Sequence, residues 1–175
     1  MNVNKYKYFF VFLTFILCFV THFVYDLFPC FLTSILFPVN ESIWEHMKML
    51  VSAEMISGIL LFIIFKKDGI FFNNYFLYLL CLFLSSILIF LIIYYPIYLI
   101  FGENFIFNVF TLFIAIYISY NVSIPILNFR NLNCGFFSFI GILLVYIIFA
   151  ILTYFPLSNP LFYDSSIGSY GISEN

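Results

Sequence analysis

The residues of this chain that can do chemistry are few, and they lie close together. Only 8% of its 175 residues are charged, yet the stretch from Pro38 to Leu50 carries two glutamates, a histidine and a lysine. Imidazoles and carboxylates are common ligands of Zn²⁺, and a further glutamate can act as a general base. This stretch is therefore the first candidate for a reactive site.

One interpretation of these residues is a metal-dependent hydrolase within a membrane. The two histidines would be neutral ligands of zinc or a similar cation, and carboxylates would complete the coordination. The candidate metal ligands are His22, Asp26, His46 and Asp164. A glutamate would take a proton from bound water, and a lysine would stabilise negative charge on an outer-leaflet lipid or peptide. The candidate catalytic residues are Glu41, Glu45 and Lys48.

Two other interpretations need no metal. In the first, the protein is not an enzyme, and the polar cluster holds helices together or binds a lipid or a membrane-protein partner. In the second, it is a small proton-coupled carrier that uses Glu54 and the Glu41/Glu45 pair, although five spans without an inverted repeat argue against it. Ser42 and Glu45 also have the spacing of a capping box, which explains both residues without any function.

Long apolar runs determine the fold class. The chain is 65% hydrophobic, with 28 Phe and 14 Tyr and a mean hydropathy of +1.15. About 20 apolar residues in a helix cross a bilayer, and such runs recur along the chain. We predict an all-α, multi-pass membrane helix bundle that forms a single integral domain with a polar tail over 156–175. The predicted spans are 6–27, 41–65, 74–95, 104–127 and 136–155, with the third stopped by Pro96.

The basic residues predict the orientation of the bundle. With five spans, those outside the 38–50 stretch all fall on one side, which the positive-inside rule makes the cytoplasm. They are Lys5, Lys7, Lys66, Lys67 and Arg130. The N-terminus would then lie inside and the C-terminus outside the cell membrane. The net charge of −2 offers no basic patch for nucleic acid, so the lipid bilayer is the expected partner.

Depth and helical facing bring the reactive residues together. Counting through a hydrocarbon layer of about 30 Å places His22, Asp26 and the 41–48 stretch at the same outer boundary. Glu54 would lie about 12 Å deeper, as a neutral acid or as a functional group facing a polar cavity. In the second span, two neighbouring stripes lie about 100° apart. They are Glu41, Glu45, Lys48 and Ser52, and Ser42, His46, Met49 and Ala53. A helix that turns both stripes toward protein must be central in the bundle.

Three segments resemble a family of small multi-pass membrane proteins of Gram-positive bacteria that is defined only by a domain of unknown function. The segments are HFVYD at 22–26, PVNESIWEHMK at 38–48, and PLFYD with GSYGI within 160–172. The resemblance covers essentially the whole chain, and its specific part is N-E-S-x-W-E-H-x-K. It implies no substrate, but it implies that the candidate residues are the family's own signature. These are His22, Asp26, Asn40, Glu41, Ser42, Trp44, Glu45, His46, Lys48 and Asp164.

Overall fold

The computed structural model describes residues 6–70 and 72–172, and within them five helices are long and apolar enough to cross a membrane. This confirms the predicted all-α membrane bundle. The spanning helices are α1 (Lys7–His22, continued by α2, Val24–Leu27), α4 (Ile43–Lys67), α5 (Tyr75–Phe101), α6 (Phe105–Ser123, continued by the 3-10 helix η2, Ile124–Asn128) and α7 (Gly135–Tyr154). A short helix, α3 (Phe31–Leu36), lies in the connection between α2 and α4.

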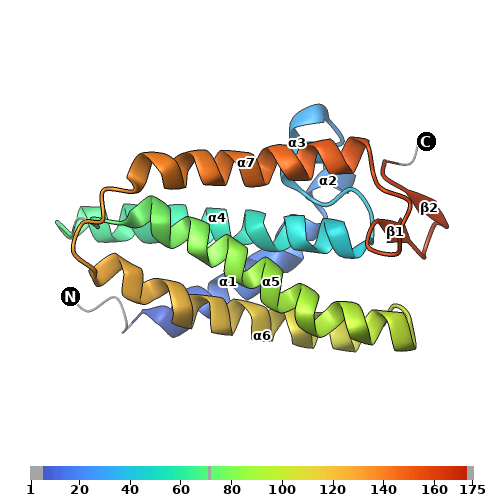
Figure 1. Cartoon of the computed structure of the whole chain (residues 1–175), viewed down its shortest axis with the longest axis horizontal. Helices are drawn as coiled ribbons and strands as arrows, with labels where there is room; N and C mark the ends of the chain where they lie inside the picture. Colours follow the sequence, from blue (N-terminus) through green and yellow to red (C-terminus); the bar gives the residue numbers. More distant parts are fainter. Residues whose placement is uncertain (1–5, 71, 173–175) are drawn as a thin grey trace.

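Helix α4 is the centre of the bundle. Figure 1 shows α7 along one side of it, α5 and α6 along the other, and α1 behind. Of the apolar stretch of α4, 61% is buried, compared with 17–39% for the other four spans. The prediction that this helix is central is confirmed, and it follows from its two polar stripes. Glu45, Lys48 and Ser52 face α3 and α7, whereas His46 and Met49 face the cavity between α1 and α6. Glu41 was predicted on the first of these stripes, but it lies before α4 and contacts His22 and His46 instead.

Polar side chains begin α4. The hydroxyl of Ser42 accepts a hydrogen bond from the backbone N–H of Glu45, as the N-cap prediction requires. In a capping box the Glu45 carboxylate would accept a hydrogen bond from the backbone N–H of Ser42. Here that N–H donates to Asn40 Oδ1 instead, at 2.9 Å. The Glu45 carboxylate is thus free to bind elsewhere.

One predicted span end is wrong, and one predicted span is interrupted within its predicted bounds. Pro96 lies inside α5, which continues to Phe101 and ends at Gly102 with φ of 72°. Proline removes one intrahelical hydrogen bond, but unwinding the helix would expose more backbone groups to lipid, so the helix continues. The first span is also interrupted, because α1 ends at His22 and Phe23 separates it from α2.

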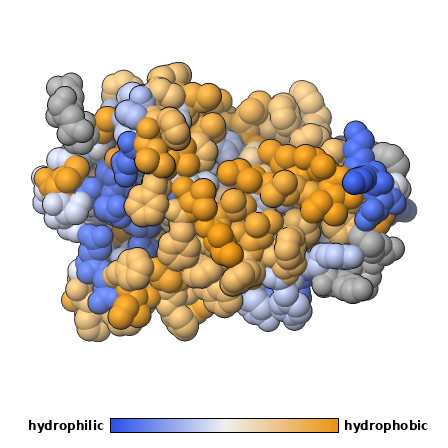
Figure 2. Space-filling model, turned by 180° about the vertical axis from the view of Figure 1, so that it is seen from behind, coloured by the Kyte–Doolittle hydropathy of each residue, from blue (hydrophilic) through white to orange (hydrophobic). Residues whose placement is uncertain are grey.

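The surface of the bundle is a broad apolar band with hydrophilic side chains toward both ends (Figure 2). Within the described part of the tail, residues 163–170 form a two-stranded antiparallel hairpin of β1 (Tyr163–Asp164) and β2 (Ser169–Tyr170). Trp44 packs against Phe149 and Phe162 with ring centroids 4.8 and 4.9 Å away. The C-terminal segment is therefore docked against the start of α4.

Candidate metal centre and its cavity

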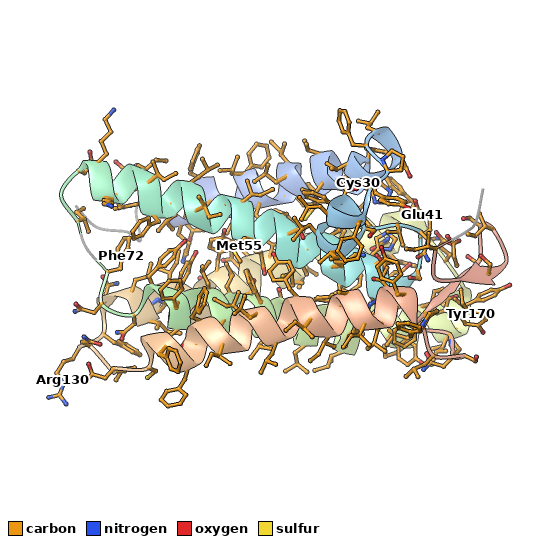
Figure 3. All side chains as sticks on the ribbon, turned by 90° about the horizontal axis from the view of Figure 1, so that it is seen from above. Cys30, Glu41, Met55, Phe72, Arg130 and Tyr170 are labelled. Atoms are coloured by element: carbon orange, nitrogen blue, oxygen red, sulfur yellow. The ribbon has the colours of Figure 1, made fainter. Side chains whose placement is uncertain are left out.

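Three ligand atoms converge where α1 ends and α4 begins, the end of the bundle at which Figure 3 labels Glu41. His22 ends α1, Glu41 lies just before the N-cap of α4, and His46 lies in its first turn. Nε2 of His22 is 3.0 Å from Oε1 of Glu41, and Nε2 of His46 is 3.6 Å from Oε2. One ligand atom from each residue lies within 4.8 Å of the other two. We call these three residues the His–Glu cluster.

The spacing of these atoms is typical of a zinc site. Bonds of about 2.0–2.1 Å in tetrahedral geometry place neighbouring donor atoms about 3.3 Å apart. The two nitrogen–oxygen separations, 3.0 and 3.6 Å, are close to that value but involve different oxygens of Glu41, and one atom from each residue lies within a wider 4.8 Å. Two imidazoles and one glutamate are a known donor set of catalytic zinc sites, whose fourth position stays open for water or substrate. The cluster has the residue types and the spacing to hold such an ion.

The backbone orients the ring of His46. Its Nδ1 lies 2.9 Å from the carbonyl oxygen of Ser42, and a carbonyl only accepts, so Nδ1 carries the hydrogen. The lone pair of the neutral ring is then on Nε2, the nitrogen that faces Glu41. Metal-binding histidines are commonly held by this kind of hydrogen bond, which fixes both tautomer and direction.

Asp164 positions Glu41 instead of joining the cluster. Its Oδ2 accepts a hydrogen bond from the backbone N–H of Glu41 at 2.9 Å, and its Oδ1 accepts from the backbone and side chain of Ser166. Burial raises the pKa of Asp164, but these hydrogen bonds outweigh it and hold the pKa below 3.8. The hydrogen bond from His22 holds the pKa of Glu41 below 4.5. Both carboxylates are therefore ionised at neutral pH.

Asp26 lies at the rim of the cluster. It is exposed on α2 and lines a cavity of about 40 Å³ with His22 and Glu41. Of the four predicted metal ligands, the structure brings His22 and His46 together, and the carboxylate that joins them is Glu41. Asp26 and Asp164 lie beside the converging atoms and are not among them.

A larger cavity of about 100 Å³ lies beside the His–Glu cluster, between α1, α4 and α6. Its polar end is formed by the cluster and Glu103. Its apolar walls are Phe19, Met49, Phe105, Val109 and Leu112. Asn108 also lines it, and Oδ1 of this buried residue has no hydrogen-bond partner in the described part of the chain. A buried, unpaired amide oxygen is costly, so it indicates a place for a ligand or water.

Glu45 and Lys48, predicted as catalytic, lie in a separate buried group. The Lys48 ammonium is 2.5 Å from Glu45 and donates to the Ser34 carbonyl at 2.7 Å and the Thr153 hydroxyl at 3.0 Å. Thr153 in turn donates to Glu45 at 2.7 Å. The three hydrogens of the ammonium are thus used, and they tie α4 to α3 and α7. Both side chains are at most 2% exposed, and neither lines the cavity beside the His–Glu cluster.

Glu54 is the deepest carboxyl, and it is fully buried. The hydroxyls of Ser86 and Ser119 lie 2.9 and 3.4 Å from its oxygens, and each also lies within 3.0 Å of a carbonyl in its own helix. A hydroxyl has one hydrogen, so each serine can donate it either to Glu54 or to its own carbonyl. In the second case a neutral Glu54 can donate its own hydrogen to one of the two serines. No ion pair involves Glu54 among the described residues. These contacts favour the neutral acid over a charged group.

Sequence reasoning missed Glu103 and Asn108 as parts of this site. Both lie where α6 begins, at the same end of the bundle as the His–Glu cluster. An amide inside an apolar span is a signal of a polar site, and Asn108 has that signal. Which helix it faces depends on the order of helices around α4, which the sequence does not contain.

Comparison with known proteins assigns the family. Residues 1–172 match DUF6512, a family of unknown function, and the chain belongs to it. No curated protein matches the chain, and no solved structure matches it.

Proposed function

We propose that this member of DUF6512 is a membrane-bound, metal-dependent hydrolase whose Zn²⁺ or similar ion is held by His22, Glu41 and His46. The observation that carries the proposal is the convergence of three ligand atoms within 4.8 Å, drawn from two segments of the chain, the end of α1 and the start of α4. Acidic residues that merely share a solvated surface do not bring their ligand atoms to one point. The orientation of the His46 ring by a backbone carbonyl adds support, since it directs Nε2 to the same point.

The residues around the cluster suit hydrolysis at the edge of a membrane. An ion with three protein ligands can bind a water molecule and lower its pKa toward neutrality. Glu103 lines the same cavity and accepts a hydrogen bond from the Ser165 hydroxyl, so we assign it the role of proton acceptor. In this proposal Glu45 and Lys48 hold the helices in place and take no part in the reaction.

The proposed site faces the outside of the cell membrane. Among the described residues, Lys7 begins α1, Lys66 and Lys67 end α4, and Arg130 follows η2. These segments lie at the end of the bundle opposite Glu41, where Figure 3 labels Arg130. The positive-inside rule makes that end cytoplasmic, and Lys48 is no exception because it is buried and paired.

Metal content tests the proposal. Detergent-purified protein should contain about one equivalent of zinc or another transition metal by mass spectrometry. His22→Ala, His46→Ala and Glu41→Gln should each lose it. Asp68→Asn, which removes an exposed acid at the other end of α4, should keep it. Folded wild-type protein that remains metal-free after incubation with Zn²⁺ would refute the proposal.

A metal-free structural or partner-binding role is the second candidate. Glu41 already accepts a hydrogen bond from His22 and lies near His46, so the cluster can tie α1 to α4 by itself. This role predicts that His22→Gln lowers the unfolding temperature of the protein by the same amount with and without a chelator. The metal centre predicts instead that the chelator destabilises only the wild type.

A further inference from the structure

The cavity beside the His–Glu cluster is polar at one end and apolar along its walls. His22, Glu41 and Glu103 form the polar end. Cys18 and Leu112 lie deeper in α1 and α6, about one turn or more below that end. The cavity thus becomes less polar with depth, in the same direction as the surrounding bilayer changes from water to hydrocarbon. A ligand that matches it has a polar group attached to a hydrocarbon chain.

The cavity also borders the lipid-facing surface. Phe19 and Phe105, which line it from α1 and α6, have 40% and 73% of their surface exposed. This part of the chain lies within two apolar spans, so the exposed surface there meets lipid. At about 100 Å³ the cavity holds only a small part of a lipid, so the rest of the chain must stay in the bilayer. Entry from the side is consistent with both facts.

The unpaired amide oxygen of Asn108 adds a chemical requirement. This residue lines the cavity and is 7% exposed, and its Oδ1, itself buried, has no hydrogen donor among the described residues. A turn of the side-chain amide would bring this oxygen to the cavity. A hydroxyl or an amide N–H next to the hydrocarbon chain would supply one. Oδ1 of Asn108 therefore favours lipids that carry a hydrogen-bond donor at this depth over lipids whose only polar groups there are esters, which cannot donate.

Charge selects a neutral headgroup. Two carboxylates, Glu41 and Glu103, line the cavity, and among the described residues no lysine or arginine does. Without a metal these two charges repel a phosphate, and with one divalent ion they are balanced, so in neither case does excess positive charge attract a phosphate. Lipids with anionic headgroups are therefore disfavoured.

We infer that the cavity between α1, α4 and α6 binds a neutral lipid with a hydroxyl or amide N–H beside its acyl chain, which enters from the bilayer between Phe19 and Phe105. The donor of the lipid pairs with Asn108, and its polar group lies against the His–Glu cluster. Such a lipid is the substrate class of the proposed hydrolase. The inference of lipid binding stands without that proposal, and only the hydrolysis of the bound lipid rests on it.

A photoreactive monoacylglycerol with a diazirine and an alkyne in its chain tests the inference in the full protein in lipid nanodiscs. The wild type should be labelled on residues of α1 and α6 at the cavity, and unlabelled monoacylglycerol should compete. Val109→Phe fills the cavity and should reduce labelling about tenfold. Val122→Phe makes the same change at an exposed site of α6 and should leave labelling unchanged. Asn108→Leu removes one neutral hydrogen bond and should reduce labelling about fivefold.

The metal content of the same samples keeps the two proposals apart. Val109→Phe should retain its metal while losing the label, whereas His46→Ala should lose the metal. Equal labelling of the Val109 and Val122 variants would overturn the inference even if metal is bound. Stronger labelling by a probe with the same chain and a phosphate headgroup would also overturn it.

Discussion

Replacing Lys48 by methionine tests how much the buried ion pair in α4 contributes to the free energy of unfolding. The ammonium bonds to Glu45, to the Ser34 carbonyl and to the Thr153 hydroxyl, and the pair is at most 2% exposed. Methionine matches the length of the lysine stem, so the change removes the charge with little change in packing. It leaves a buried carboxylate without its cation and a carbonyl without its donor. Removing one member of such a pair costs about 3–5 kcal/mol of unfolding free energy.

The double variant Glu45→Gln/Lys48→Met separates charge from packing. Replacing both members of a buried pair is often nearly neutral, because the desolvation of two ions is no longer required. The double variant should therefore be more stable than Lys48→Met alone, by about 2 kcal/mol or more. Lys67→Met, an exposed change at the other end of α4, should stay within about 0.5 kcal/mol of wild type.

Unfolding in mixed detergent micelles, followed by circular dichroism, measures these differences. Lys48→Met should also keep its metal, because the ion pair lies outside the His–Glu cluster. If Lys48→Met proves as stable as Lys67→Met, the assignment of a structural role to the pair is wrong. If the two substitutions in the double variant are simply additive, the carboxylate and the ammonium are not coupled.

Three further predictions concern other parts of the fold. Hydrogen bonds hold the pKa of Asp164 below 3.8, so its stabilising contribution is present above that pH and is lost as the pH falls through the lowered pKa. Protonation of Asp164 should release the C-terminal hairpin from the start of α4, and the fluorescence of Trp44, the single tryptophan, should report this release. Asp164→Asn should show the released state already at neutral pH. A Trp44 fluorescence that does not change with pH would contradict the assignment. Glu54→Gln should remove the infrared band of a protonated carboxylic acid and leave stability within about 1 kcal/mol, whereas an unchanged spectrum would mean that Glu54 is ionised. Gly58→Ala would place its Cβ 2.4 Å from Leu79, so it should destabilise the α4–α5 contact by about 1–3 kcal/mol, and a stabilised variant would show that Leu79 moves freely.

The spans and the depth of the reactive residues could be predicted because both depend on distance along one helix. A rise of 1.5 Å per residue places His22 and His46 at the same boundary whatever the arrangement of the bundle. The sequence also predicted the Ser42 cap and the central place of α4, since both depend on local spacing. The structure has five candidate spans, the Ser42 cap and a central α4, and it places both histidines at the same end of the bundle.

The division of the polar stretch between two sites could not be predicted in the same way. Glu45 and His46 are adjacent in sequence but point about 100° apart, so they meet different helices. Helix α7 supplies Thr153 to Glu45, and α6 supplies the cavity wall beside His46. The order of helices around α4 decides these partners, and it depends on packing between segments far apart in the chain.

The docking of the hairpin has a consequence for how the protein is made. The backbone of Glu41 is held by Asp164, and Trp44 donates its backbone N–H to Leu161, so the C-terminal segment completes the surroundings of a site that α1 and α4 began. Of these segments it is the last to be synthesised. All five spans can therefore be inserted while the site is still open, and the site is completed only after translation has passed α7. A chain cut before Pro160 would keep all five spans but should bind metal poorly, so quality control at this site would act on the finished protein.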